Sequence, residues 1–167
     1  MQISCLRASV FSAMMLPRET DDPRPAMIVA MKEQILQSGS VVVYYATFEK
    51  GRIKELAKDF PEHADFLLPI NERIWDQLDV FKYCFQDHRL ALSKSIKVVL
   101  PTFVPELSYK VLNVQKGDQA QLEWRKMIDL NWEPTKQKLA DDLKAYCELD
   151  TLAMVKLHEF LKTFMEC

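Results

Sequence analysis

The stretch VVVYYATFEK (residues 41–50) decides the fold. Its first five residues are β-branched or aromatic, a composition typical of a strand that is buried on both faces. A helical pattern of apolar residues then runs from Phe48 to Phe60 and ends at Pro61. A buried strand that leads directly into a helix is expected in a protein that mixes helices and a sheet.

Strand-like and helical patterns alternate along the rest of the chain. The sequence predicts one helix-rich domain of the α/β or α+β class, spanning residues 1–167. The further segments are a candidate strand at 2–11, a helix from Pro25 to Ser38-Gly39, a shorter helical stretch within 64–85 around Ile74, Leu78 and Phe81, a short helix or strand at 95–100, a helix after Gly117, and a long helix from Pro134.

Composition limits the classes of function. The chain has 167 residues, of which 49% are hydrophobic and 28% are charged, as expected for a soluble globular protein. A net charge of −2 argues against tight nucleic-acid binding without metal ions, but not against an enzyme that meets phosphates through bound cations. The sequence favours neither a zinc site nor a disulfide framework. Its four cysteines are scattered, and its histidines (His63, His88 and His158) lack a metal-binding spacing. No apolar run reaches the roughly 18 residues of a membrane span, so a cytoplasmic protein without membrane contact is expected.

Asp150 occupies an unusual place in the C-terminal helical pattern. It falls on the apolar stripe between Cys147 and Met154, and Tyr146 lies one turn before it on the same side. A buried carboxylate is costly unless a cation, a metal ion or hydrogen-bond donors compensate its charge. One interpretation is therefore a polar site on the inner face of the helix, and the other is an acid at the edge of the stripe that caps or bridges locally. The sequence pattern favours neither interpretation of Asp150.

Glu49 is the second candidate acid. It follows the strand at 41–45 and stands in the first turn of the next helix, where sites of open α/β sheets are usually assembled. An acid in a first helical turn is also favoured by the helix dipole, and Thr47 could cap that helix. Taken alone, Glu49 fits this structural role better. Glu49 becomes a candidate site residue through its combination with Asp150.

These segments resemble motifs of a known enzyme group. YATFE (residues 45–49) is similar to the second motif of the DEDD 3′–5′ exonucleases, and YCELD (residues 146–150) has the Tyr-x-x-x-Asp spacing of the third motif in their tyrosine subgroup. Nearly the whole chain resembles a bacterial family of unknown function, number 2779, which is itself similar to that group. Further stretches that carry this resemblance, in order, are QIS (2–4), DPR (22–24), VVY (42–44), RIWD (73–76), SIKVVLP (95–101) and PELSY (105–109).

The resemblance implies a ribonuclease H-like fold, with a central sheet flanked by helices, and a 3′–5′ exonuclease acting on single-stranded DNA or RNA. In such enzymes four carboxylates hold two Mg²⁺ or Mn²⁺ ions, roughly 3.5–4 Å apart. Carried over, Glu49 and Asp150 would be metal ligands and catalytic residues, and Tyr146 would orient the attacking water. Lys97 could meet a phosphate, and Asp76 occupies a pattern position; a solvated lysine and a helix-start acid are the more ordinary explanations.

The chain also departs from the pattern. The first motif, an Asp-x-Glu pair on the first strand, is absent, so the domain is expected to be incomplete at its N-terminus and to lack that strand. Tyr45 stands where asparagine is preferred, Leu92 replaces a glycine, and Leu6 replaces a histidine. With half of the ligands missing, little nuclease activity is expected from this chain alone. The alternative is a degenerate, non-catalytic binding or assembly module. A missing strand also predicts self-association, or a second chain that supplies the strand.

Overall fold

A small parallel sheet lies at the centre of the chain. The computed structural model describes residues 3–5, 22–129 and 133–164. Its strands run in the order β1 (Ile3–Cys5), β2 (Ser40–Val43) and β3 (Ile74–Asp76), and both neighbouring pairs are parallel. Parallel strands end at the same edge of a sheet, so the residues that follow β2 and β3 lie near each other.

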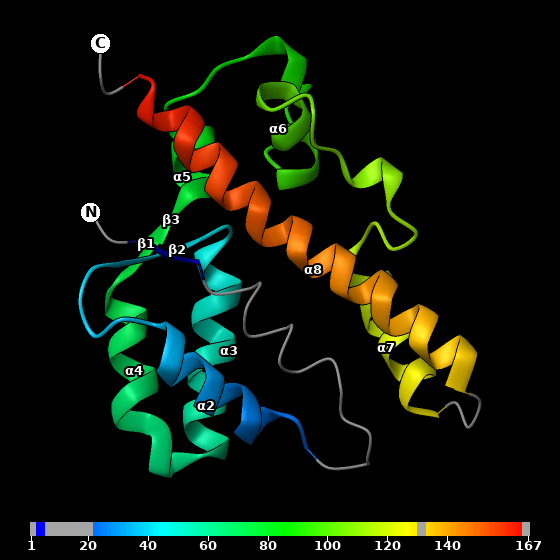
Figure 1. Ribbon diagram of the computed structural model, residues 1–167. Coiled ribbons are helices and arrows are strands. Elements are labelled where there is room, and N and C mark those ends of the chain that lie inside the picture. The colour runs from blue at the N-terminus through cyan, green and yellow to red at the C-terminus, as the bar shows by residue number, and fades with distance from the viewer. Residues whose placement is uncertain (1–2, 6–21, 130–132, 165–167) are drawn as a thin grey trace.

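Three helices cover one face of this sheet: α2 (Arg24–Gln34), α3 (Ala46–Asp59) and α4 (Ala64–Glu72) (Figure 1). Val41 and Val43 point to this face, because alternate residues of a strand face the same side. The core that forms there, called the sheet core below, consists of Ile28, Met31, Ile35, Val41, Val43, Ile53, Leu56, Ala57, Leu67 and Ile70.

The opposite face of the sheet meets α8 (Glu133–Lys162), the longest helix described. Val42 is buried and is paired in register with Trp75 of β3, so both side chains point to this face. The Trp75 ring packs edge-on against His158 of α8, with 5.9 Å between ring centroids. β2 is thus buried on both faces, as its unbroken run of valines predicts, whereas Trp75 of β3 stays 36% exposed.

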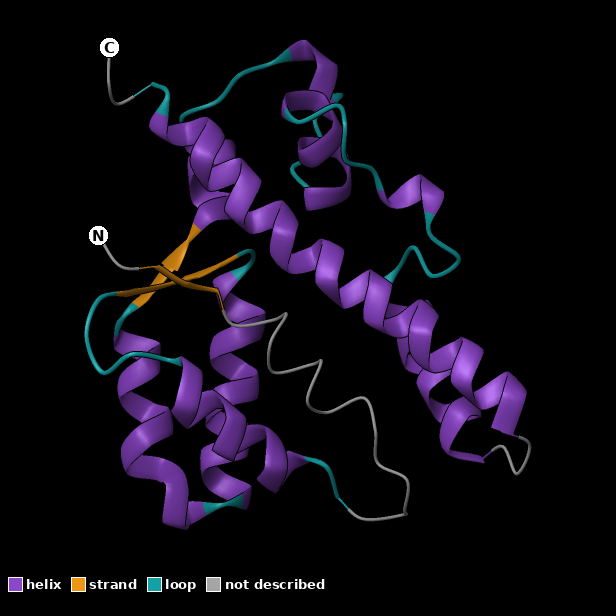
Figure 2. Cartoon of the chain, in the orientation of Figure 1, coloured by secondary structure: helices purple, strands orange, loops and turns teal. Residues whose placement is uncertain are grey.

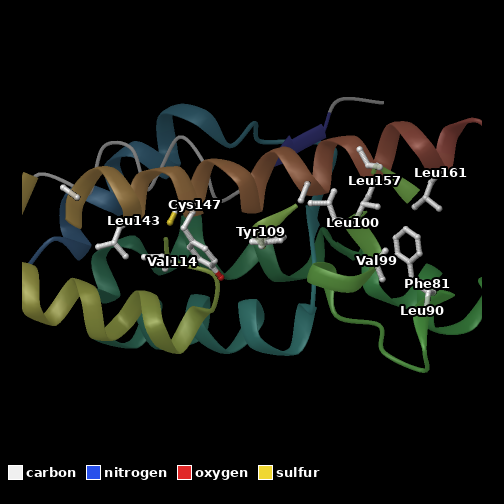
Figure 3. Packing of buried hydrophobic residues seen from close by; sticks show 14 of the residues in the cluster. Phe81, Leu90, Val99, Leu100, Tyr109, Val114, Leu143, Cys147, Leu157 and Leu161 are labelled. Carbon is white, nitrogen blue, oxygen red and sulfur yellow. The ribbon is translucent and has the colours of Figure 1, made fainter. Parts of the chain in front are cut away.

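A second core, called the α8 core below, fills the space between α8 and the remaining helices. These are α5 (Gln77–Tyr83), α6 (Ile96–Phe103) and α7 (Gly117–Asp129), with the short 3-10 turns η2 (His88–Leu90) and η3 (Tyr109–Val111) (Figure 2). A third 3-10 turn, η1 (Pro61–His63), joins α3 to α4. Phe81 is fully buried in the α8 core and is stacked on Phe103, with 5.6 Å between ring centroids. Figure 3 shows side chains from α5, α6 and the loops converging on the underside of α8.

Most of the predicted elements are confirmed. The helices near Pro25, after Phe48, after Gly117 and from Pro134 correspond to α2, α3, α7 and α8. Within the candidate strand at 2–11, Ile3–Cys5 is extended, and the other residues lie outside the described part of the chain. The short helix or strand expected at 95–100 is a helix, which begins at Ile96 after the extended residue Ser95.

The interpretation of residues 64–85 is wrong in one respect. Ile74 was assigned to a helical stretch, but it begins β3, which separates α4 from α5. Three residues are too few to show a strand periodicity, and Ile74 happens to fall at helical spacing from Leu78 and Phe81. The long-range pairing of Val41 with Ile74 decides the conformation instead.

The fold class is therefore mixed α/β, mostly helical, around a three-stranded parallel sheet. None of the helices within the described residues is long and apolar enough to cross a lipid bilayer.

Candidate functional site

Asp150 lies on the buried side of α8, as the first of the two interpretations required. Only 6% of its surface is exposed, and Tyr146, one turn earlier, is buried as well. Leu143, Cys147, Met154 and Leu157 continue the buried stripe on either side. The apolar side chains dock this face of the helix, and they carry the carboxylate into the protein with them.

Tyr109 compensates part of the cost of burying this carboxylate. Its hydroxyl donates a hydrogen bond of 2.5 Å to Oδ1 of Asp150, and its ring is 3% exposed. Tyr109 opens η3, and the hydroxyl of Ser108 accepts a hydrogen bond from the amide of Lys110 at the start of that turn. Figure 3 shows Tyr109 beneath α8, between Cys147 and Leu100.

Lys97 lies above the two tyrosine rings. Its Nζ is 5.5 Å from the ring centroid of Tyr109 and 5.4 Å from that of Tyr146, and the two centroids are 6.0 Å apart. Both distances permit a cation–π interaction. α6, η3 and α8 therefore bring Lys97, Tyr109, Tyr146 and Asp150 into one group, called the tyrosine cluster below.

Glu49 belongs to the sheet edge. It is half-buried in the first turn of α3, four residues after Tyr45, the residue that joins β2 to this helix. The structure places Glu49 on α3 and Asp150 on α8. Their joint role in a cation site stays a prediction.

Asp76 ends β3 at the same edge, and its carboxylate organises the backbone there. Oδ1 accepts hydrogen bonds from the amides of Tyr45 (2.9 Å) and Leu78 (3.0 Å), and Oδ2 accepts one from the amide of Ala46 (2.7 Å). The helix-start explanation for Asp76 is thus confirmed, since it caps α5. The same carboxylate also binds the first turn of α3.

Tyr45 adopts a left-handed conformation at this edge, with φ 79° and ψ 69°. Bulky residues rarely do so, because Cβ then crowds the backbone, whereas asparagine is enriched there. An asparagine at this position is therefore expected to adopt the same backbone conformation with less strain than tyrosine. The Asp76 carboxylate bonded to two successive amides holds the strained turn in place.

The acids of the described residues do not amount to a two-cation site. Within residues 3–5, 22–129 and 133–164, no three Asp, Glu, His or Cys side chains come together to hold a metal ion. Two ions need about four carboxylates in the arrangement that the resemblance implies. The described residues by themselves therefore do not fit such a pair of ions.

Tyr109 is the residue that the sequence reasoning missed. It ends the PELSY stretch (residues 105–109), which contributed to the resemblance, but no role was assigned to it. A tyrosine in an irregular segment gives no periodic signal, and its partner lies 41 residues away along the chain. In the sequence, only the position of Tyr109 in a polar stretch between two apolar segments pointed to a role for it.

Comparison with known sequences places the chain in a family. The family described as "Domain of unknown function (DUF2779)" matches residues 2–95, from β1 to the start of α6. The chain belongs to the DUF2779 family. The match covers β2, Tyr45, Glu49 and Asp76, whereas the tyrosine cluster lies beyond it.

Longer bacterial proteins resemble most of the chain. It is 32% identical to "Uncharacterized protein MG366 homolog" of Mycoplasma pneumoniae, over 83% of this chain and 23% of that protein. It is 29% identical to "Uncharacterized protein UU173" of Ureaplasma parvum, over 90% of this chain and 24% of that protein. The chain thus spans about a quarter of the length of the curated relatives it matches. No solved structure matches it.

Proposed function

We propose that this chain is part of a nucleic-acid-acting domain of the 3′–5′ exonuclease type, with a ribonuclease H-like fold and a polar site around Asp150. The observation that carries the proposal is a carboxylate buried on α8 with a tyrosine one turn before it. This arrangement agrees with the Tyr-x-x-x-Asp motif, and the mixed α/β fold is compatible with the expected class. The chain's membership in the DUF2779 family is compatible with the proposal, because the resemblance to the exonucleases was drawn partly through that family.

Each residue of the tyrosine cluster has a distinct part in this proposal. Asp150 supplies a carboxylate whose position Tyr109 fixes through its hydroxyl. Lys97 adds a positive charge beside two aromatic rings, which favours the approach of an anionic phosphate of single-stranded DNA or RNA. Tyr146 contributes the ring, and its phenol is the group that would orient water in a complete site.

Catalysis is not expected from this chain alone. The described acids do not fit two divalent cations, and no hydrolytic step is assigned to them. In the proposal, a longer polypeptide or a second chain supplies the missing carboxylates. That the curated relatives are about four times longer is compatible with a larger whole.

The test is release of nucleotides from 3′-labelled single-stranded DNA and RNA in the presence of Mn²⁺. This chain should release almost none, whereas a chain extended at its N-terminus by the residues encoded upstream should be active. In the active protein, Asp150→Asn should reduce release at least 100-fold, on the order of the loss of a group that is essential in the transition state. Asp141→Asn is the matched control, because Asp141 lies exposed on the same helix and accepts a hydrogen bond from Gln137.

The non-catalytic alternative makes the opposite prediction. Two observations favour a binding or assembly module. Oδ1 of Asp150 already accepts a hydrogen bond from the Tyr109 hydroxyl, and no three metal ligands cluster within the described residues. If the extended chain is folded but inactive, and binds single-stranded oligonucleotides equally well with or without Mn²⁺, this alternative holds. Equal activity of Asp150→Asn and the unsubstituted extended chain would refute the role of Asp150.

A further inference from the structure

α8 meets the sheet through a histidine. His158 is 8% exposed, two turns beyond Asp150, and its ring lies against the edge of Trp75 in β3. One turn earlier on the same face of α8, the carbonyl of Met154 accepts a hydrogen bond of 3.1 Å from Nε2 of Gln77, the first residue of α5. His158, Trp75 and Gln77 thus form the contact, called the α8–sheet contact below.

This contact contains buried polar atoms that have no hydrogen-bond partner. Both ring nitrogens of His158 and Oε1 of Gln77 are in this state within the described part of the chain. A neutral imidazole without partners loses some solvation on burial, but a charged imidazolium would lose far more. The α8–sheet contact therefore favours the neutral form of His158 over the charged form.

The surroundings of His158 also favour the neutral form of its ring. Burial is the main cause that lowers the pKa of His158 below its usual value of 6.5, and Lys162 lowers it further, while Glu159 opposes the change. Both charged groups are on α8 itself. β3 and α5 present Trp75 and Gln77, which carry no charge, and β1 is described by its backbone alone.

We infer that His158 is a proton-sensitive switch, which keeps the C-terminal half of α8 docked on the sheet while its ring is neutral and releases it when the ring is protonated. In the released state, called open below, the imidazolium is solvated and the Trp75 contact is broken. This inference does not depend on the proposed function. α8 also carries Tyr146 and Asp150, so its release would disturb the tyrosine cluster as well.

The direction of the pH dependence follows from linkage. A basic group with a lowered pKa in the docked state binds more protons in the open state. Docking is then fully stabilised above about pH 6.5 and weakens as the pH falls below that value. One proton can raise the ratio of open to docked molecules by at most about tenfold per pH unit.

The test uses Trp75 as a reporter in the full chain. Trp124→Phe and Trp132→Phe leave Trp75 as the sole tryptophan, and its emission should shift to the red as the pH is lowered from 7.5 to 5. Hydrogen exchange of the amides of residues 154–162, corrected for the intrinsic effect of pH, should accelerate over the same range. His158→Gln keeps a neutral polar side chain and should abolish both changes.

His88→Gln is the matched control, because the side chain of His88 is 96% exposed and its replacement should leave both transitions in place. If His158→Gln does not fold, His158→Phe replaces it, and in the unsubstituted chain NMR can follow protonation of the His158 ring directly. Transitions that persist in the substituted chain would overturn the inference. Protonation of His158 without faster exchange in residues 154–162 would overturn it equally.

Discussion

The sheet core and the α8 core differ in how far their residues lie apart along the chain. The sheet core draws its buried residues from 28–70, whereas the α8 core draws them from 81–161. The first combines regular helices with one buried strand. The second also needs residues from turns and loops, such as Tyr109 and Val114. Local pattern therefore specifies the sheet core, and long-range packing specifies the α8 core.

The largest expected effect tests whether the two cores unfold together. Phe81 is fully buried in the α8 core, so Phe81→Ala should lower the free energy of unfolding by about 3–5 kcal/mol. Because α8 contacts the sheet and α5 contacts β2, we expect one cooperative transition in urea, shifted as a whole. Leu67→Ala in the sheet core is the counterpart and should shift the same transition by about 2–5 kcal/mol.

Two separate transitions would break this picture. If hydrogen exchange of β2 is unchanged in Phe81→Ala while that of α8 rises, the cores are independent units, and the comparison becomes one between two folding units.

The next effect concerns the sheet edge. Asp76→Ala removes the acceptor of three backbone amides, those of Tyr45, Ala46 and Leu78, and should cost about 2 kcal/mol in urea unfolding. Asp79→Ala, an exposed acid in the first turn of α5, is the control and should cost much less. Equal losses in the two variants would show that Asp76 acts only through its charge near α5.

Local pattern and long-range contacts both contribute to the site, and the local sequence displays only the first. Periodicity predicts the strand that forms β2 (Ser40–Val43), the helix that carries Glu49 and the inward position of Asp150. β3 escaped prediction because its three residues form a strand only by pairing with Val41–Val43. Tyr109 escaped because its partner is brought near by packing of α8, which no local pattern encodes. The positions of Lys97 and Asp150 relative to Glu49 depend on the same packing.

The smallest expected effect is a gain in stability. Leu92 has φ 65° and is 98% exposed, and glycine adopts this left-handed conformation without strain. Leu92→Gly relieves the crowding of Cβ but increases the entropy of the unfolded chain, so a net stabilisation of about 0.5–1 kcal/mol is expected. Urea unfolding measures it, and Ser93→Gly, next to it, serves as the control and should not stabilise the chain.

A loss of stability in Leu92→Gly would mean that the left-handed turn carries no strain. Tyr45 offers the contrasting case in the sheet region, since Asp76 holds its turn through two amides. The turn at Leu92 would then constrain the backbone less than the turn at Tyr45.

The order of the two cores along the chain has a consequence for synthesis on the ribosome. All buried residues of the sheet core have been translated by Ile70, while Leu161 completes the α8 core. At roughly 5–20 residues per second, about 5–20 seconds separate these two points. During that interval the face of the sheet that carries Val42 and Trp75 lacks α8, its later partner, so the nascent chain exposes an apolar surface that a chaperone can bind.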